Sequence, residues 1–421
     1  MDQTRWPPTL IDMDRAPEET DIRERWHPND GVTAPTVRSY AMGGYMHSID
    51  DVRARQDAML DTLRVIVEFE TPSDDKAAVD KLVAYLQDRC RELGGEVESI
   101  SQADYGDLTV ARWTGSNDQS PILVLTHIDT VWPVGTLAGK PFEVGATEAR
   151  GPGIYDMKAS IAMMLQAMRL MSESGAQHRP ITWLINTEEE VGSPVSRPHI
   201  EQLAAQSEYV LVLEPPVAPN GALKTARKGV GMFNMHITGL AAHAGADPEK
   251  GISAIQELAN QIQYLHGMTD FNLGTTVNVG VVAGGTKRNV VAAEASALID
   301  LRVTTMAEAD RVVKSILSAQ PRLQGTKVHV EGGLNRPPME RTDRIAAAFQ
   351  QVRAVGQRLG LQLSEASTGG GSDGNFTAAI GATTIDGLGC TGDGAHAEHE
   401  FISLNGFVER TALLTELLAT L

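Results

Sequence analysis

Acidic residues and histidines directly follow three short apolar runs of the sequence. His127 and Asp129 come after PILVLT, the glutamates Glu188–Glu190 follow ITWLIN, and Glu214 is the last residue of YVLVLE. Asp156 stands in GPGIYDMK, where a glycine-rich turn leads into a pattern typical of a helix. Carboxylates and imidazoles are the side chains that hold divalent metal ions and move protons near neutral pH. The sequence therefore carries the side chains of a metal-dependent catalytic site, if the fold brings them together.

The apolar runs predict the elements that would bring these side chains together. Residues 121–126, 181–186 and 209–214 have the length and composition of buried strands, and a helical pattern over 157–174 separates the first two. Strands that alternate with helices favour an α/β fold with a central, mostly parallel sheet and flanking helices. Ligands bind outside the carboxyl ends of such strands. We therefore expect the acids and His127 to meet at one edge of the sheet.

Clustered carboxylates predict a cation at this edge, because they repel one another unless a positive charge lies between them. Zinc, cobalt and manganese suit a cluster of oxygen ligands and imidazoles. Each signal has an ordinary alternative when taken singly: the His-x-Asp pair could be a surface turn, Asp156 could cap a helix, and the glutamates could form a solvated loop. The metal site is favoured because these positions are topologically equivalent: each lies where a strand ends or a helix begins, at one edge of the predicted sheet.

A second pattern begins near Gly229 and predicts an inserted domain. Its order of strand, helix, strand, strand, helix and strand is the ferredoxin-like α+β pattern, and the elements are expected at residues 232–238, 252–266, 276–282, 295–303, 310–319 and 327–331. The first pattern resumes near Arg341. The expected organisation is an N-terminal arm (1–48), a catalytic domain (49–228 and 338–421) and an inserted domain (229–337).

The composition narrows the class of protein. The 421 residues include 36 Lys and Arg against 54 Asp and Glu, a net charge of −18, and 42% are hydrophobic. This describes a soluble globular chain and argues against nucleic-acid binding, which draws on Lys and Arg. No apolar run approaches the ~18–20 residues of a membrane span, and the N-terminus has no apolar signal region. We expect no membrane partner, a cytoplasmic location and, with only Cys90 and Cys390, no disulfide framework.

The motifs, taken in order, resemble those of a known superfamily. HIDTV, GPGIYDMK, EEEVG, LEP, GLAAHAG, TGGGSDG and GAHAEHEF follow one another between residues 49 and 421. This set is similar to that of the zinc exopeptidases and amidohydrolases, which include glutamate carboxypeptidase, acetylornithine deacetylase, succinyl-diaminopimelate desuccinylase and aminoacylase. GPGIYD, INTEEEVGS and TGGGSDG are most similar to the glutamate carboxypeptidase branch. The resemblance implies the zinc-exopeptidase fold, in which the inserted domain serves as a lid and dimerisation domain.

The resemblance also implies a site for two divalent ions, with zinc expected and cobalt or manganese as alternatives. One ion would be held by His127, Asp156 and Glu214, and the other by Glu190, His396 and the same Asp156. The choice of His396 over His399 follows the family spacing of four residues from the ligand histidine to a glutamate, here Glu400. In the family the peptide bond after the bridging aspartate is cis, which here is Asp156-Met157.

The resemblance also implies catalytic roles for two further acids, Asp129 and Glu189. Asp129 would accept a hydrogen bond from the other ring nitrogen of His127 and so fix its tautomer. Glu189 would be the general base, which takes a proton from water activated by the ions and passes it to the leaving amine after attack on the amide carbonyl. Glu188 stands where the glutamate carboxypeptidases usually have Asp, and Ala159 replaces a glycine that is common after DMK.

Residues of the inserted domain are expected to complete the site. In the family the histidine that matches His243 crosses a dimer interface and stabilises the oxyanion in the partner's active site, and the asparagine that matches Asn289 faces the substrate. A homodimer is therefore expected. Read from the sequence alone, His243 would be an ordinary loop histidine.

Locally basic and glycine-rich segments predict recognition of a substrate carboxylate. Arg336 in LNRPPM matches the family position that binds the C-terminal carboxylate, and Lys224 lies in the basic run LKTARKG. Backbone N–H groups near Gly370 and Gly371 could approach the same carboxylate. The alternatives are surface solvation for the basic residues and a phosphate cradle for the glycines, although the loop lacks the GK[ST] of a P-loop.

The predicted function is that of a two-metal hydrolase. It would cleave the amide bond of an N-acyl amino acid or release a C-terminal amino acid from a peptide with a free carboxylate, as a glutamate carboxypeptidase does. The alternative within the class is a deacylase of the acetylornithine deacetylase or aminoacylase type, or a dipeptidase. Outside the class, the alternatives are an inactive relative that serves as a binding protein and, less in keeping with the motifs, a phosphohydrolase.

Overall fold

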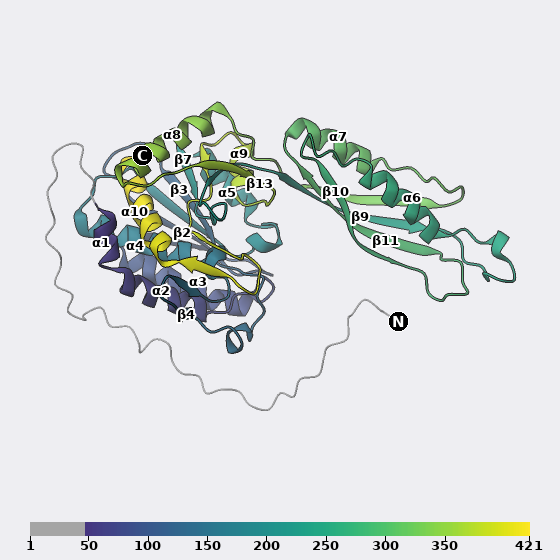
Figure 1. Cartoon of the computed structure of the whole chain (residues 1–421), viewed down its shortest axis with the longest axis horizontal. Coiled ribbons are helices and arrows are strands. Elements are labelled where there is room, and N and C mark those ends of the chain that lie inside the picture. Colours follow the sequence, from purple (N-terminus) through teal and green to yellow (C-terminus); the bar gives the residue numbers. More distant parts are fainter. Residues whose placement is uncertain (1–46) are drawn as a thin grey trace. The chain divides into compact units, whose positions relative to one another are not determined.

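The computed structural model describes residues 47–421, and Figure 1 shows how their helices and strands are arranged. The N-terminal arm predicted for residues 1–48 lies outside the described residues, apart from His47 and Ser48. The first helix, α1 (Ile49–Arg53), starts at a capping box in which Ser48 and Asp51 bond to each other's backbone N–H groups.

The main sheet contains the three strands that precede the candidate site residues. Its six strands are ordered β1-β2-β6-β3-β7-β14. The strands β6, β3, β7 and β14 run parallel, whereas β2 pairs antiparallel with β6 and β1 antiparallel with β2 at one edge. The mostly parallel sheet is therefore correct for the strands that carry the site. The bounds are β1 Glu96–Ile100, β2 Leu108–Trp113, β3 Ile122–His127, β6 Ile181–Asn186, β7 Tyr209–Val212 and β14 Thr384–Ile385.

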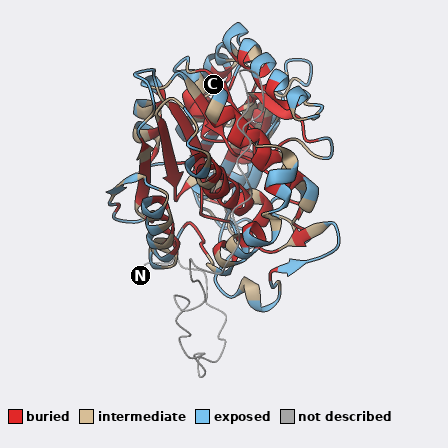
Figure 2. Ribbon diagram, turned by 90° about the vertical axis from the view of Figure 1, so that its left-hand side faces the viewer, coloured by how far each residue is buried: buried red, intermediate tan, exposed pale blue. Residues whose placement is uncertain are grey.

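Helices cover both faces of this sheet, as the near-continuous apolar strands require. Alternate residues of β3 point to opposite sides: Ile122 and Val124 join one hydrophobic cluster, and Leu123 and Leu125 join another. In Figure 2 the central strands of the sheet are accordingly coloured as buried. The first cluster includes side chains of α2 (Gln56–Glu68), α3 (Lys76–Glu92), α4 (Ala159–Ser174), α8 (Asp343–Arg358) and α10 (Leu404–Thr420), and the second those of α5 (Arg197–Ala205) and α9 (Gly374–Ala379).

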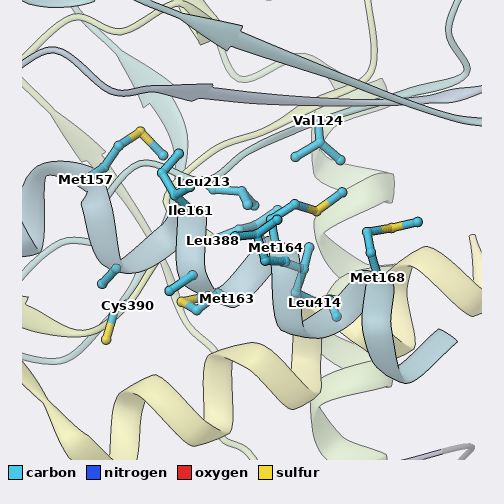
Figure 3. Packing of buried hydrophobic residues seen from close by; sticks show 14 of the residues in the cluster. Val124, Met157, Ile161, Met163, Met164, Met168, Leu213, Leu388, Cys390 and Leu414 are labelled. Atoms are coloured by element: carbon cyan, nitrogen blue, oxygen red, sulfur yellow. The ribbon is translucent and has the colours of Figure 1, made fainter. Parts of the chain in front are cut away.

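The central helix α4 anchors the turn that carries Asp156. Figure 3 shows methionines of α4 between Val124 of β3 and Leu414 of α10. Met163 is fully buried, and Met168 is 3% exposed; flexible thioether side chains fill such irregular space well. Because α4 starts directly after the kinked turn Ile154–Lys158, its packing restricts where that turn can lie.

Residues 229–336 form a second sheet with a hydrophobic cluster of its own. The strands β9 (Gly229–Thr238), β10 (Thr276–Gly284), β11 (Glu294–Val303) and β12 (Lys327–Arg336) are ordered β10-β11-β9-β12 and all pair antiparallel. Helix α6 (Ala254–His266) follows β9, and α7 (Met306–Leu317) follows β11. The buried side chains of this segment, such as Phe233, Ile237 and Val312, cluster with one another. The element order is the expected one.

Strand β12 is longer than the sequence pattern predicts. The prediction ended it at Glu331, but it continues through Gly332 and Gly333 to Arg336. Two consecutive glycines usually indicate a turn, but here pairing with β9 continues to Val230, across an irregularity between Leu334 and Arg336. The extension places Arg336 at the end of the strand.

Two small sheets complete the structure of residues 47–421. One has the order β15-β16-β5-β4, with β4 Glu143–Val144, β5 Glu148–Arg150, β15 Gly392–Asp393 and β16 Phe401–Ser403. The other pairs β8 (Leu223–Arg227) with β13 (Glu365–Thr368) in parallel. Their strands are too short to leave a clear periodicity in the sequence. None of the helices in the described part has both the length and the apolar character of a membrane span.

Candidate active site

Three of the predicted metal ligands lie together at the carboxyl ends of β3 and β7. His127 is the last residue of β3, and its Nε2 lies 3.2 Å from Oδ1 of Asp156 and 3.4 Å from Oε1 of Glu214. Glu214 follows the end of β7 by two residues. His127 and Glu214 are buried, and Asp156 is largely so. One ring nitrogen and two carboxylates therefore converge on one point.

A second group of three shares Asp156 with the first. Nε2 of His396 lies 3.1 Å from Oε2 of Glu190 and 3.4 Å from Oδ2 of Asp156. Within each group the candidate ligand atoms all lie within 4.8 Å of one another. Asp156 faces His127 with one oxygen and His396 with the other, so its carboxylate joins the two groups. The Asp156-Met157 peptide bond is cis, as the resemblance implied.

The two histidines differ in their access to solvent. The side chain of His127 is 2% exposed, whereas that of His396 is 50% exposed. His396 also has a φ of +61°, in the left-handed region that residues other than glycine rarely adopt. The cluster is therefore closed on the side of the sheet and open on the side of the loop that carries His396.

The carboxylates of the cluster attract positive charge strongly. Burial by itself would lower the pKa of His127, yet hydrogen bonds to Asp129, Asp156 and Glu214 raise it well above its usual value. Hydrogen bonds to Asp156 and Glu190 raise the pKa of His396 to about 10. A cluster that holds protons this firmly also favours a metal cation, which competes with protons for the same nitrogen and oxygen atoms.

The donor set fits a divalent metal. Imidazole nitrogens and carboxylate oxygens are the ligands of zinc and of the neighbouring first-row metals. In addition, Oε1 of Glu190 is buried without a hydrogen-bond partner among the described residues, although a buried carboxylate oxygen is costly to leave unpaired. A bound metal ion would pair this oxygen and would offset the repulsion among the carboxylates of the two groups around Asp156.

Glu189, the predicted base, lies beside the cluster and faces an arginine. It begins the 3₁₀ turn Glu189–Val191 that follows β6. Its Oε1 lies 2.8 Å from Nη2 of Arg336, and its side chain is 11% exposed. Burial raises the pKa of Glu189 well above the usual range, against the opposing effect of Arg336. The arrangement leaves Glu189 outside both groups of candidate ligands, and its role as a base stays a prediction.

Asp129 contacts both His127 and the glutamate turn. Nδ1 of His127 lies 3.0 Å from the backbone oxygen of Asp129 and 3.4 Å from its carboxylate oxygen Oδ1. The Asp129 carboxylate also accepts hydrogen bonds from the backbone N–H groups of Glu189 and Glu190 and from the hydroxyl of Ser73. The predicted contact with His127 is thus made by two oxygens of Asp129, and the carboxylate in addition fixes the turn that carries the base.

The predicted carboxylate-binding residues surround the same cluster. Nζ of the buried Lys224 lies 4.0 Å from Oε2 of Glu214 and makes no hydrogen bond within residues 47–421. Arg336, 4% exposed, pairs with Glu189 and with Asp373. A Cβ added at Gly371 would come within 2.7 Å of Cδ of Arg336, so only glycine permits this approach.

His243 and Asn289 lie together but apart from these contacts. The backbone N–H of Ala244 donates to the backbone oxygen of Asn289, and His243 pairs with Val290 in a β-bridge. Both residues are exposed. Within residues 47–421, neither side chain makes a hydrogen bond or ion pair with the acidic cluster. Their roles at a partner's site stay a prediction.

Arg227 and Asp386 form a buried ion pair that no motif of the sequence predicts. Nε and Nη2 of Arg227 each lie 2.7 Å from a carboxylate oxygen of Asp386, Nη2 is 3.4 Å from Glu214, and Nη1 donates to the backbone oxygens of Gly370 and Gly371. The guanidinium is therefore fully occupied. The position of Asp386 could have indicated a site residue, because it directly follows strand β14 just as the other acids follow their strands.

Comparisons with known proteins identify the family and the fold. The model of peptidase family M20/M25/M40 matches residues 123–420. Carboxypeptidase G2 of Pseudomonas sp. (strain RS-16) is 30% identical over 376 residues, which are 87% of this chain and 90% of that protein. Aminopeptidase PepT of Bacillus cereus ATCC 10987 has a TM-score of 0.72 at 22% identity, over 86% of this chain and 98% of that one.

A further solved structure shares the fold and concerns a metal protein. The YXEP protein of Bacillus subtilis, described as a dinuclear metal binding peptidase from the M20 family, has a TM-score of 0.65 at 14% identity, over 87% of this chain and 98% of that one. The expected resemblance to the metal-dependent exopeptidases and amidohydrolases is confirmed. This chain belongs to peptidase family M20/M25/M40 and is a metal-dependent hydrolase.

Proposed function

We propose that this hydrolase uses two divalent ions, with zinc as the expected metal, and cleaves an amide next to a free carboxylate. The substrate would be an N-acyl amino acid or a peptide that loses its C-terminal residue. The observation that carries the proposal is the carboxylate of Asp156, which faces His127 with one oxygen and His396 with the other. The relative named carboxypeptidase G2 supports the substrate class.

In this proposal His127, Asp156 and Glu214 hold one ion, and Asp156, Glu190 and His396 hold the other. When bound, the two ions would lower the pKa of the attacking water and polarise the scissile carbonyl. Asp129 keeps His127 oriented from behind the ring, and its carboxylate holds the backbone of Glu189 and Glu190. The protein thereby fixes its donors before the substrate arrives.

Glu189 carries the proton in the proposed reaction. Its carboxylate takes a proton from water as the oxygen attacks the carbonyl carbon, and it returns the proton to the nitrogen of the leaving amine. Arg336, 2.8 Å from Oε1 of Glu189, holds the carboxylate in one orientation. Because Arg336 also pairs with Asp373, its position does not depend on Glu189 alone.

The substrate carboxylate is proposed to bind beside Glu214. Lys224 is the cation with an uncommitted ammonium there, because its one ion-pair partner in the described part of the chain is Glu214 at 4.0 Å. The backbone N–H groups near Gly370 and Gly371 would complete the carboxylate site, and Arg336 would join it by exchanging its present bonds to Asp373 and Glu189 for the substrate. Arg227 is excluded from this role by its contacts, since Asp386, Glu214 and the two glycine carbonyls occupy its donors.

The test is a substrate panel combined with metal removal. Purified protein is assayed on N-acyl-glutamates, N-acetyl amino acids, dipeptides and phosphate esters, before and after treatment with EDTA, with metal content measured on the same samples. We expect amide hydrolysis that falls to background without metal and returns with Zn²⁺, Co²⁺ or Mn²⁺. Amide hydrolysis that persists in metal-free protein, or turnover of phosphate esters alone, would contradict the proposal.

We also propose a homodimer in which the partner subunit's His243 completes each site, as the resemblance implies. His243 is exposed and is held by a β-bridge to Val290, so its ring is accessible to a partner subunit. Two inactive variants, His243→Ala and Glu189→Gln, can be mixed under conditions that exchange subunits. The mixture should regain about a quarter of the wild-type activity, because half of the dimers are mixed and each of those has one intact site. A mixture that stays inactive although subunits exchange, or a fully active monomer, would refute the shared site.

A further inference from the structure

Glu400 is a buried carboxylate for which the proposed chemistry has no use. It is 5% exposed and pairs with no Lys, Arg or His among residues 47–421. Instead, four N–H groups donate to it. Oε1 accepts from the backbone N–H groups of Tyr155 at 2.9 Å and Asp156 at 3.1 Å, and Oε2 accepts from the backbone of Gly153 and the indole of Trp132, both at 2.9 Å.

The fold brings Glu400 to this turn through a short strand pairing. Glu400 directly precedes β16, whose first residue, Phe401, pairs with Arg150 at the end of β5. The chain then leaves β5 for the turn in which Gly153 has a φ of +68°, a conformation that suits glycine. The backbone N–H groups of this turn point inward to the carboxylate, in the manner of an anion-binding concavity.

Both groups of candidate metal ligands depend on the segments that Glu400 connects. Asp156 belongs to both groups, and His396 lies four residues before Glu400 in the same loop. One carboxylate therefore fixes the backbone of the shared ligand and, through the chain, the loop of a second ligand. Neither contact requires a metal ion to be present.

We propose that Glu400 is a positioning residue that presets Asp156 for two metal ions; this inference rests on the two-metal function proposed above. A carboxylate is needed because each oxygen accepts two hydrogen bonds. A glutamine would keep one such oxygen but would turn an NH₂ group towards two N–H donors, which leaves buried donors unpaired. The turn would then move, and Asp156 would move with it.

The test compares Glu400→Gln with a matched control, Glu398→Gln. Glu398 lies two residues away in the same loop, but its side chain is 86% exposed, and its one ion pair among residues 47–421 is with Lys140. Zn²⁺ affinity is measured for each of the two sites by competition with a chromophoric chelator, and thermal unfolding is recorded for the metal-free proteins. Loss of a group that orients metal ligands typically weakens metal affinity about 10–100-fold. We expect a loss of that size at both sites in Glu400→Gln and wild-type affinities in Glu398→Gln.

Other variants separate positioning from a purely structural role. His396→Ala should weaken one site and leave the other, whereas Glu400→Gln should weaken both, because only the latter acts through Asp156. A Glu400→Gln protein that is less stable but binds Zn²⁺ with wild-type affinity would overturn the inference. If Glu400→Gln does not fold, Trp132→Phe removes one of the four donors and should still weaken both sites, and unchanged affinity in that folded variant would overturn it. A wild-type protein that binds no divalent metal would instead refute the proposed function itself.

Discussion

Glu189→Gln is expected to lose about 10²–10⁴-fold of kcat, the usual contribution of a positioned proton carrier, while its metal content stays at the wild-type level. The amide has the shape of the carboxylate but cannot take a proton from water. The contacts that position residue 189 are retained, because Asp129 accepts from its backbone N–H and Arg336 donates to its backbone oxygen. The variant should therefore fold and bind metal normally.

The measurements are kcat and KM on the substrate that the panel identifies, together with metal analysis of the same preparation. Glu98→Gln is a suitable control, since Glu98 lies on β1, is 52% exposed and pairs with Arg112 away from the cluster. Near wild-type kcat in Glu189→Gln would remove Glu189 from the proposed mechanism. Loss of metal together with kcat would instead assign Glu189 to the metal ligands.

Asp156→Asn should abolish activity by a different route, through loss of both ions. The aspartate faces His127 at 3.2 Å and His396 at 3.4 Å, so it contributes to each proposed metal position. An asparagine removes the negative charge that both positions share, and it turns an NH₂ group, which cannot bind a cation, to one of them. We expect metal content to fall well below that of the wild type at both positions and kcat to fall to background.

Single-position variants provide the comparison for this prediction. Glu214→Gln should affect the position beside His127, and His396→Ala the position beside Glu190, each leaving the other ion in place. The two ions can be counted by metal analysis after gel filtration. Full retention of both ions in Asp156→Asn would show that the carboxylate does not bridge them.

The sequence predicted which residues would meet because the carboxyl ends of parallel strands lie at the same edge of an α/β sheet, where ligands bind. His127 and Glu214 follow parallel neighbours, β3 and β7, and their side chains had to emerge at the same edge. Asp156 could be placed because its glycine-rich turn leads into the buried helix α4. For these residues, the local pattern and the sheet topology pointed to the same answer.

Contacts that join distant segments could not be predicted in this way. Arg336 meets Glu189 only because β12 continues past its two glycines, and Arg227 meets Asp386 across 159 positions of the chain. Only its spacing from His396 marks Glu400 in the sequence, although its four hydrogen bonds go to other loops. Such pairings depend on the packed structure and leave no periodicity in the sequence.

The chain enters and leaves the second sheet beside two buried arginines. Arg227 lies just before β9, and Arg336 is the last residue of β12. One is bonded to Asp386 and Glu214, and the other to Asp373 and Glu189. Of the two, Arg336 is part of that sheet, whereas Arg227 belongs to β8 and pairs with Thr368 of β13. A rigid rotation of the second sheet would therefore move the guanidinium of Arg336 relative to that of Arg227. Such a rotation would change the 2.8 Å distance between Nη2 of Arg336 and Oε1 of Glu189, and with it the electrostatic field at that carboxylate.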